Sequence, residues 1–429
     1  MSKKILLITL PLVLIWCNYH RPASSQDFLQ DQQVIGYRQG ASRDPVARLQ
    51  QRLDRGESKL EYDETNGYLK AVLRELQIPV SSQGLVFSKT SFQLHRIEPL
   101  NPRAIYFNDD AYVGWVRAGE VLELAAVDPE RGGIFYVLDQ TKTGRPKFIR
   151  NDECLQCHAA NNTRNVPGFV VRSVYPDYRG YPISSLGSHV TSHTSPLNER
   201  WGGWYVTGTH GSERHAGNLL FEESSRPETP ESLSGGNLTS LVSRFSPRGY
   251  LSPHSDIVAL MVLEHQTQTH NLVTRLSYET RIAMHHQKVL DEALQRKTEG
   301  LSDSTHRRIE RATAELVKQL LFIGEARWRS PITGTSSFAR DFMAGGRRDS
   351  RGRSLRDLDL QTRLFRYPCS YLIYSDAITA LPAEARQELW RQLVEALSGK
   401  SPDESYKSIP VADRQSVIEI LRETKVSLK

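Results

Sequence analysis

The run Asn151-Asp152-Glu153-Cys154-Leu155-Gln156-Cys157-His158 constrains this chain more than any other part of its sequence. It contains a C-x-x-C-H pattern, in which two thiols three positions apart can each add across one vinyl group of the same porphyrin. The imidazole that follows is then held under the ring as the proximal ligand of the iron. The pattern therefore predicts a single, covalently bound haem c, attached through Cys154 and Cys157, with His158 as its proximal ligand.

Two other uses of a C-x-x-C pair have to be weighed against haem attachment. A zinc site needs a second Cys/His pair at ligand spacing, and beyond the N-terminal segment the only other cysteine is the isolated Cys369. A dithiol redox pair needs no histidine after it and sits in a βαβ context. Haem attachment accounts for every member of the motif, and it leaves Cys369 to be buried, ligating or reactive.

The N-terminus predicts export, which haem attachment to such a motif requires in bacteria. Lys3 and Lys4 precede a short apolar run at 5–16, and Ala23-Ser24-Ser25 suits signal peptidase. Residues 1–25 are therefore expected to be a signal peptide, and the mature chain is expected to be periplasmic or otherwise exported, with no transmembrane span. Cys17 could anchor a lipoprotein, but Trp16 stands where that signal takes a small residue.

Length and charge limit the remaining possibilities. The 429 residues, less the signal peptide, suffice for two or three domains with proper cores. Removal of residues 1–25 lowers the formal net charge from +6 to +3, because the segment carries Lys3, Lys4, Arg21 and no acidic residue. This charge gives no argument for a nucleic-acid partner.

The hydrophobic pattern predicts an α+β protein, with an antiparallel β-rich haem-bearing domain followed by a mostly α-helical C-terminal domain. Residues 26–66 are expected to be a polar arm, and 67–221 the haem domain. This domain begins with a short helix at 67–76. Its β-branched and aromatic runs before the motif predict strands at 85–87, 104–107, 112–116, 121–127, 134–138 and 147–149.

After the motif, the sequence predicts the rest of the haem domain, a linker and a helical domain. A strand at 168–175 is expected to return to the same sheet, and 187–218, dense in His, Trp and Gly, to line the haem pocket. Residues 222–250 are the predicted linker. The helical domain at 251–429 is expected to start with a long helix from Ile257, with further helices near 302–323, 382–397 and 411–421.

Four runs carry a resemblance to a known family. They are Cys154-x-x-Cys157-His158, the RWGGWYVTGTHG run from Arg200, the ALMVLEHQ run from Ala259, and Tyr367-Pro368-Cys369-Ser370-Tyr371. Together they resemble a family of exported bacterial single-haem proteins described as cytochrome c domain proteins. The resemblance implies a c-type haem and export, and it implies no particular activity. Strands followed by C-x-x-C-H are also similar to periplasmic haem sensors with a PAS-like sheet, an analogy at the level of the fold.

The sixth ligand of the iron is open on sequence grounds. His265 is the first candidate, because it follows the apolar segment 257–263 and a buried imidazole needs a polar partner. His210 and His215 in the Gly-rich stretch are the alternatives. Three further residues remain possible ligands: Met261, His193 and Cys369.

Two classes of function follow from one haem. In the first, the protein transfers single electrons to and from a periplasmic redox partner protein through a six-coordinate iron. In the second, the distal site is open, and the protein is a peroxidase-like haem enzyme or a haem-based sensor of redox state or a gas. Arg200, Arg214 and Arg275 could equip such a distal pocket. Catalytic activity is therefore left undecided.

Overall fold

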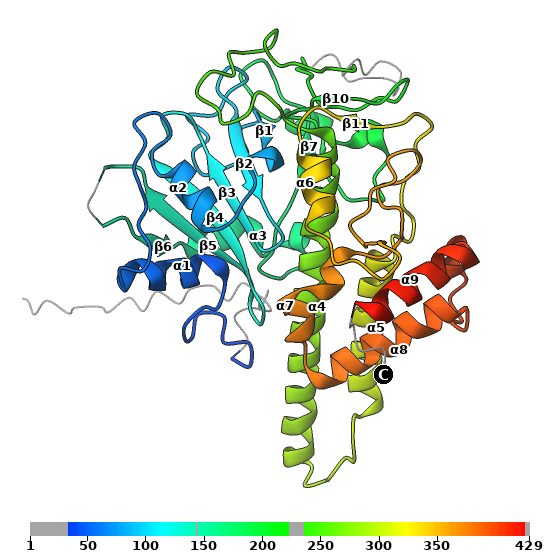
Figure 1. Cartoon of the computed structure of the whole chain (residues 1–429). Helices are drawn as coiled ribbons and strands as arrows, with labels where there is room; N and C mark the ends of the chain where they lie inside the picture. Colours follow the sequence, from blue (N-terminus) through cyan, green and yellow to red (C-terminus); the bar gives the residue numbers. More distant parts are fainter. Residues whose placement is uncertain (1–32, 143–144, 223–235, 425–429) are drawn as a thin grey trace, which may run out of the picture.

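The computed structural model describes residues 33–142, 145–222 and 236–424, so the predicted signal peptide and Cys17 lie outside the described residues. Within these ranges, an antiparallel sheet is flanked by two short helices and by a long central helix that begins the helical C-terminal region (Figure 1). The predicted α+β architecture is confirmed at this level.

The main sheet has seven strands, and each neighbouring pair is antiparallel. The six strands predicted before the motif are confirmed as β1 to β6. In spatial order the strands are β6 (Phe148–Arg150), β5 (Gly132–Asp139), β4 (Val121–Asp128), β3 (Ala111–Trp115), β2 (Arg103–Phe107), β1 (Gly84–Val86) and β9 (Trp204–Tyr205).

Both faces of this sheet are covered, which explains why its strands are apolar runs rather than alternating ones. In β2, Ala104 and Tyr106 join the core on the side of the N-terminal helices, whereas Ile105 and Phe107 pack against the core on the other side. Side chains alternate between the two faces of a strand, so both residues of each pair meet a hydrophobic layer.

The strand predicted at 168–175 does not return to this sheet, and that prediction is wrong. β7 (Arg172–Val174) pairs instead with β8 (Ser188–Val190) in a separate two-stranded sheet, while β9 supplies the seventh strand. A Cβ atom at Gly202 would lie 2.2 Å from the carbonyl oxygen of Val174. The glycine therefore lets the chain pass β7 closely on its way to β1.

The segment predicted as a polar arm instead contains a helix. α1 (Pro45–Asp54) begins after Asp44, whose carboxylate accepts hydrogen bonds from the backbone N–H groups of Val46 and Ala47. Val46 and Leu49 lie on one face of the helix and are buried against the sheet. The apolar residues of this segment are few, but their helical spacing is enough to form a packed face.

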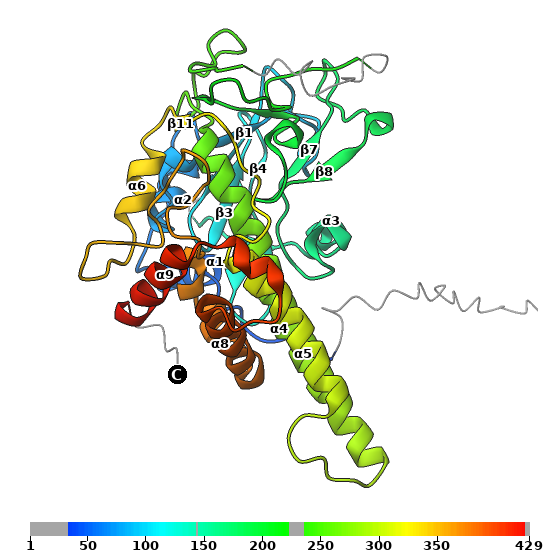
Figure 2. The same cartoon turned by 90° about the vertical axis from the view of Figure 1, so that its right-hand side faces the viewer.

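The long predicted helix is confirmed as α4 (Ile257–Ala293), capped by the carboxylate of Asp256. At 37 residues, it is about 55 Å long. Its residues 257–274 are buried on every side, because the sheet covers one side and α5 with the C-terminal segments covers the other. Its last turns and the beginning of α5 project from the body as a hairpin (Figures 1 and 2).

The remaining helices are short or lie in the C-terminal region, where the predictions near 302–323, 382–397 and 411–421 are confirmed. The α-helices are α2 (Leu69–Glu75), α3 (Leu155–His158), α5 (Asp303–Leu320), α6 (Phe338–Ala344), α7 (Asp376–Thr379), α8 (Ala383–Ser398) and α9 (Val411–Glu423). Single 3-10 turns are η2 (Val80–Ser82), η3 (Asp152–Cys154), η4 (Asn161–Thr163), η5 (Ser184–Leu186), η6 (Leu197–Glu199), η8 (Tyr371–Tyr374) and η9 (Glu404–Ser408). A second small sheet pairs β10 (Gly208–Thr209) with β11 (Thr333–Gly334).

The sheet and the helical region share one core. Val86, Phe107 and Tyr112 of the sheet lie in the same buried cluster as the apolar residues of α4, α5 and α8. In the described part of the predicted linker, Leu241 and Phe245 are also buried against the sheet. Among the helices in the described ranges, none has the combination of length and apolar character needed to cross a membrane.

Candidate functional site

The C-x-x-C-H motif lies at the edge of the main sheet, directly after β6. Asn151 ends the strand and its side chain accepts a hydrogen bond from the backbone N–H of Glu153, which starts the turn leading to α3. Residues three apart on one helical turn project to the same side. Cys154 is half-buried and Cys157 is exposed, and neither is in a disulfide. Figure 2 shows α3 as a short helical turn beside α4.

The ring of His158 has a defined tautomer. Its Nδ1 lies 2.9 Å from the carbonyl oxygen of Gly168, and a carbonyl can only accept, so Nδ1 carries the proton. The lone pair is then on Nε2, which has no hydrogen-bond partner among the described residues. Burial lowers the pKa of His158, which keeps the imidazole neutral. A neutral imidazole whose other nitrogen donates to a carbonyl is the usual form of a metal-ligating histidine.

Two hydrogen bonds join the first and last residues of the loop from His158 to Gly168. The backbone N–H of Gly168 donates to the carbonyl oxygen of His158 at 2.8 Å, so the two residues exchange a pair of hydrogen bonds. The ring of Phe135, on β5, packs against the imidazole with 4.8 Å between the ring centroids. The sheet and the loop together restrict the orientation of the imidazole.

Asn271 of α4 holds this loop from the opposite side. Its Oδ1 accepts from the backbone N–H of Phe169 at 2.8 Å, and its Nδ2 donates to the carbonyl oxygen of Phe169 at 2.7 Å. A Cβ atom at Gly168 would lie 2.2 Å from Asn271 Oδ1, so a side chain there would displace the amide. Sequence reasoning missed both residues. The available signals were a glycine ahead of an apolar run and a lone asparagine in the middle of a buried helix.

The thiol of Cys154 does not have the character of a reactive thiol in a redox-active dithiol. Burial, and to a lesser degree the nearby carboxylate of Glu123, raises the pKa of Cys154 to about 11. Reactive dithiols depend on a lowered thiol pKa, because the thiolate is the nucleophile. Within the described ranges, there is also no group of three or more His, Cys, Asp or Glu residues that could hold a metal ion. Two unbonded thiols and a directed imidazole lone pair fit the set of groups that covalent haem attachment requires.

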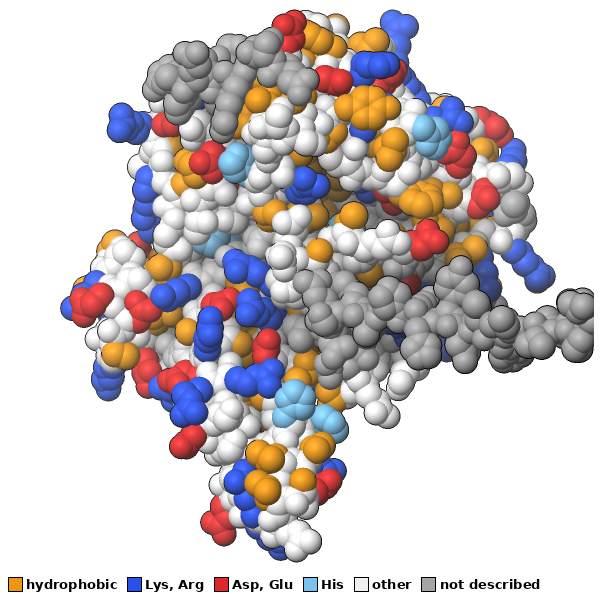
Figure 3. Space-filling model, turned by 180° about the vertical axis from the view of Figure 1, so that it is seen from behind, with side chains coloured by type: hydrophobic (Ala, Val, Ile, Leu, Met, Phe, Trp, Pro, Cys, Tyr) orange, Lys and Arg blue, Asp and Glu red, His pale blue; other side chains and the backbone are white. Residues whose placement is uncertain are grey.

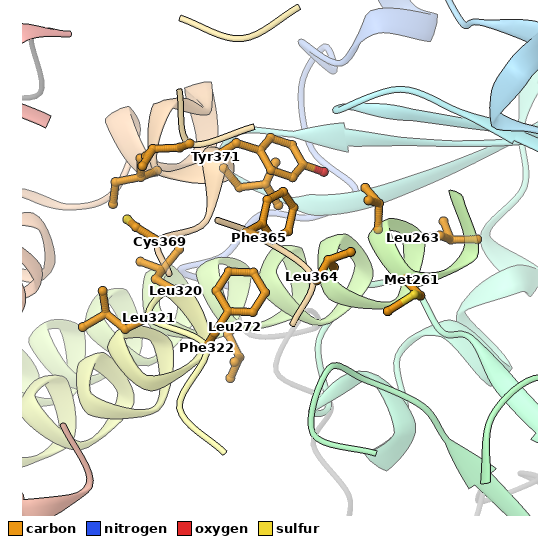
Figure 4. Close-up of a cluster of buried hydrophobic side chains, with 14 of the residues drawn as sticks. Met261, Leu263, Leu272, Leu320, Leu321, Phe322, Leu364, Phe365, Cys369 and Tyr371 are labelled. Atoms are coloured by element: carbon orange, nitrogen blue, oxygen red, sulfur yellow. The ribbon is translucent and has the colours of Figure 1, made fainter. Parts of the chain in front are cut away.

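Cys369 is buried, and its thiol does not have the properties of a reactive thiol. It lies in the same hydrophobic cluster as Leu320 and Leu321 (Figure 4), with none of its surface exposed to solvent. Burial raises the pKa of its thiol to about 12. Met261 belongs to this same cluster. The surroundings of both sulfur atoms are those of ordinary core residues.

His265 lies in the helical core, and no hydrogen bond or ring contact joins it to the motif in the described part of the chain. Its Nε2 lies 2.8 Å from the hydroxyl of Ser370, and the Gln319 amide donates to its Nδ1 at 3.3 Å. The ring stacks on Phe322, with 4.1 Å between centroids. Both of its nitrogens are engaged in hydrogen bonds, which leaves no lone pair directed at another ligand.

His193 and His210 each retain one unpartnered nitrogen. His193 is buried, its Nδ1 lies 3.5 Å from His265 Nδ1, and its Nε2 has no partner. His210 Nε2 donates to the carbonyl oxygen of Gly236 at 2.9 Å, and its Nδ1 has no partner. His215 Nδ1 accepts from the N–H of Gly217, so the proton of this neutral ring is on Nε2, which also has no hydrogen-bond partner among the described residues. In this tautomer, Nε2 has no free lone pair for a metal ion.

The stretch predicted as a pocket wall is organised by a buried ion pair. Arg200 Nη1 lies 3.1 Å from Glu264 Oε2, and both side chains are almost completely removed from solvent. Arg200 also donates to the carbonyl oxygens of His193 and Ser195. Burial raises the pKa of Glu264 to about 7, although Arg200 lowers it. The guanidinium of Arg200 therefore supports the fold of this stretch through its bonds to Glu264, His193 and Ser195.

The other two arginines proposed for a distal pocket lie elsewhere. Arg275 is half-buried and pairs with Glu315 at 3.3 Å. Arg214 donates to the carbonyl oxygens of Ser212 and Glu213 in an exposed loop. Neither contacts the motif through an interaction between described residues.

Comparison with protein-family models, with curated proteins and with solved structures finds no match for this chain.

Gly168→Ala tests whether the loop from His158 to Gly168 depends on its close contact with Asn271. The added methyl group collides with the Asn271 amide, so we expect the free energy of unfolding to fall by about 2 kcal/mol, a typical cost of overpacking. Gly345→Ala is the matched control, because the nearest atoms to its Cβ lie 3.7 Å away. The control should change stability by less than about 0.5 kcal/mol in urea unfolding. Equal losses in the two variants would contradict this account of the loop.

His270→Gln tests the acid sensitivity of the buried region. His270 Nε2 donates to the carbonyl oxygen of Asp109, and burial lowers the pKa of this histidine to about 4. Between pH 6.5 and 4 the unfolded chain therefore takes up a proton that the folded chain does not, and stability falls as pH falls. Glutamine keeps the donor but does not titrate. We expect the parent to lose roughly 3 kcal/mol more than the variant over this window. Parallel curves of unfolding free energy against pH would contradict this expectation.

Proposed function

We propose that this protein is a periplasmic monohaem c-type cytochrome that transfers single electrons. The observation that carries the proposal is the hydrogen bond from His158 Nδ1 to the carbonyl oxygen of Gly168, which leaves the Nε2 lone pair available as an iron ligand. The adjacent free thiols of Cys154 and Cys157 complete the attachment set.

The chain's own residues have distinct roles in this proposal. Cys154 and Cys157 would hold the haem through thioether bonds, and His158 would supply the imidazole ligand of its iron. Gly168 and Asn271 keep the imidazole in one tautomer and orientation, which raises its basicity as a ligand. When bound, the haem iron supplies a one-electron couple between its ferric and ferrous states.

The same proposal includes export and membership of the family of exported single-haem cytochrome c domain proteins. It is supported by the signal-like N-terminus and by the four sequence runs that carry the resemblance. A periplasmic redox protein is the expected partner. The exposure of Cys157 supports this, because an attachment residue at the surface favours short-range contact with a partner.

A second candidate function is a haem enzyme or a haem-based sensor with an open distal site. It is favoured by one observation, which concerns His265, the first candidate for the sixth ligand. His265 uses both nitrogens elsewhere, whereas His193 Nε2 and His210 Nδ1 remain without partners. These two atoms are the better candidates for a sixth ligand that is recruited when haem is bound.

Covalent attachment is the first test of the proposal. Protein produced with the cytochrome c assembly machinery should retain one haem per chain after acid-acetone extraction. The Cys154→Ala, Cys157→Ala double variant should lose it, because no other pair of described cysteines stands at this spacing. Cys369→Ala is the control, and it should keep its haem because that thiol is buried in the core. A colourless parent protein, or a coloured double variant, would contradict the proposal.

Carbon monoxide binding distinguishes the two functions. An electron-transfer protein with a six-coordinate iron should show little change in the spectrum of its reduced form when carbon monoxide is added. Substitution of the sixth ligand should then open the iron: we expect this for His193→Gln or His210→Gln, and not for His265→Gln. Ready binding of carbon monoxide by the parent protein would instead favour the enzyme or sensor.

A further inference from the structure

A cavity of about 240 Å³ lies where the turn between β2 and β3 meets the segments around α6 and α7. The turn contributes Asp109 and Asp110, and the C-terminal region contributes Arg347, Arg356 and Asp376. Pockets for drug-sized ligands are larger, at roughly 300–1,000 Å³. This cavity therefore suits a small metabolite.

One pair of charges in the cavity is already satisfied within the protein. Arg356 forms an ion pair with Asp109, and its guanidinium lies 4.7 Å from the ring centroids of both Phe342 and Tyr371. An arginine held between two aromatic rings and a carboxylate is a fixed part of the wall. The charges left for a ligand are those of the other three residues.

Asp110 and Asp376 are two carboxylates without a partner. Neither side chain forms a hydrogen bond or an ion pair with a residue that the structure describes. Burial, followed by the charges of Asp109 and Asp376, raises the pKa of Asp110 to about 6. Arg48 and Arg356 lower it, but do not offset the crowding. A cationic group placed between the two carboxylates would relieve this repulsion.

Arg347 supplies the opposite charge at the same cavity. Its guanidinium stacks on the ring of Tyr374 at 4.8 Å and has no carboxylate partner in the described part of the chain. Stacking holds the guanidinium flat, with its N–H groups free at the edges. Such an edge is suited to a carboxylate, which it can bind through two parallel hydrogen bonds.

We propose that this cavity binds a small free amino acid, with its ammonium group between Asp110 and Asp376 and its carboxylate on Arg347. The ligand carries both charges because the unpaired groups of the cavity have both signs. A metal ion would leave Arg347 unsatisfied, and the residues described here contain no set of three metal-ligating side chains. A simple amine would likewise leave the guanidinium without a partner.

The cavity lies next to α4, the helix whose Asn271 holds the loop from His158 to Gly168. Its residue Asp109 accepts a hydrogen bond through its backbone carbonyl from His270, the neighbour of Asn271 on α4. Binding of the amino acid does not depend on the proposed haem, because the cavity residues and the motif share no side chain. The two proposals can therefore fail separately.

Isothermal titration calorimetry on the full-length protein, as purified, tests the site. The probes are L-alanine, L-serine and L-lysine, with propionate and ethylamine as compounds that lack one of the two charges, and calcium as the metal probe. We expect at least one amino acid to bind with a dissociation constant below about 1 mM, and to raise the melting temperature through linkage. Propionate, ethylamine and calcium should not bind.

Variants assign the binding to the named residues. Asp376→Asn and Arg347→Gln are both at exposed positions, so both should fold, and each should weaken binding at least tenfold. Glu299→Gln, an exposed acid at the end of the projecting hairpin, is the matched control and should bind like the parent. Absence of binding by all three amino acids, tighter binding of calcium or ethylamine, or equal binding by Asp376→Asn and the parent would each overturn the proposal.

Discussion

The hydrogen bonds between the Asn271 side chain and the backbone of Phe169 join α4 to the loop that follows the C-x-x-C-H motif. The proposed site depends on this connection. An amide can donate and accept at once, so a single residue of α4 satisfies both polar groups of Phe169 in a region without solvent. The neighbouring carbonyl, that of Gly168, receives the proton of His158. The imidazole therefore owes its orientation to a residue more than a hundred positions away in the chain.

Several polar side chains in the buried part of α4, from Glu264 onward, link this helix to other elements. Gln266 donates to the hydroxyl of Tyr112 on β3 and accepts from the hydroxyl of Tyr371, which joins the sheet to the C-terminal region. Glu264 pairs with Arg200 on the loop before β9. Groups of this kind are costly to bury unless they are paired, so they specify how α4 sits between its neighbours.

Local patterns in the sequence were sufficient for much of the fold. The strands before the motif and the helices after Asp256 were predictable, because β-branched runs, helix caps and helical periodicity act over a few residues. The exchange of β7 for β9 was not predictable, since it depends on the close passage of Gly202 past Val174. α1 was missed because its apolar face is only a few residues wide.

The candidate site also contains residues that the sequence predicts and residues that it does not. Cys154, Cys157 and His158 stand out because the chemistry of attachment requires them in sequence order. Gly168 and Asn271 were not foreseen, because their roles arise only when α4 lies against the loop. The candidate sixth ligands could be named by residue type alone, and nothing in their spacing distinguished the fully bonded His265 from His193 and His210.

The projecting end of the α4–α5 hairpin has a mechanical consequence. Val289, Leu290 and Leu294 are exposed there, and in Figure 3 this end is a narrow extension with hydrophobic side chains at its surface. The same helix is clamped between two layers for its first eighteen residues or so. Asn271 lies in this buried part, so the exposed tip and the loop that Asn271 holds are mechanically connected through one continuous helix.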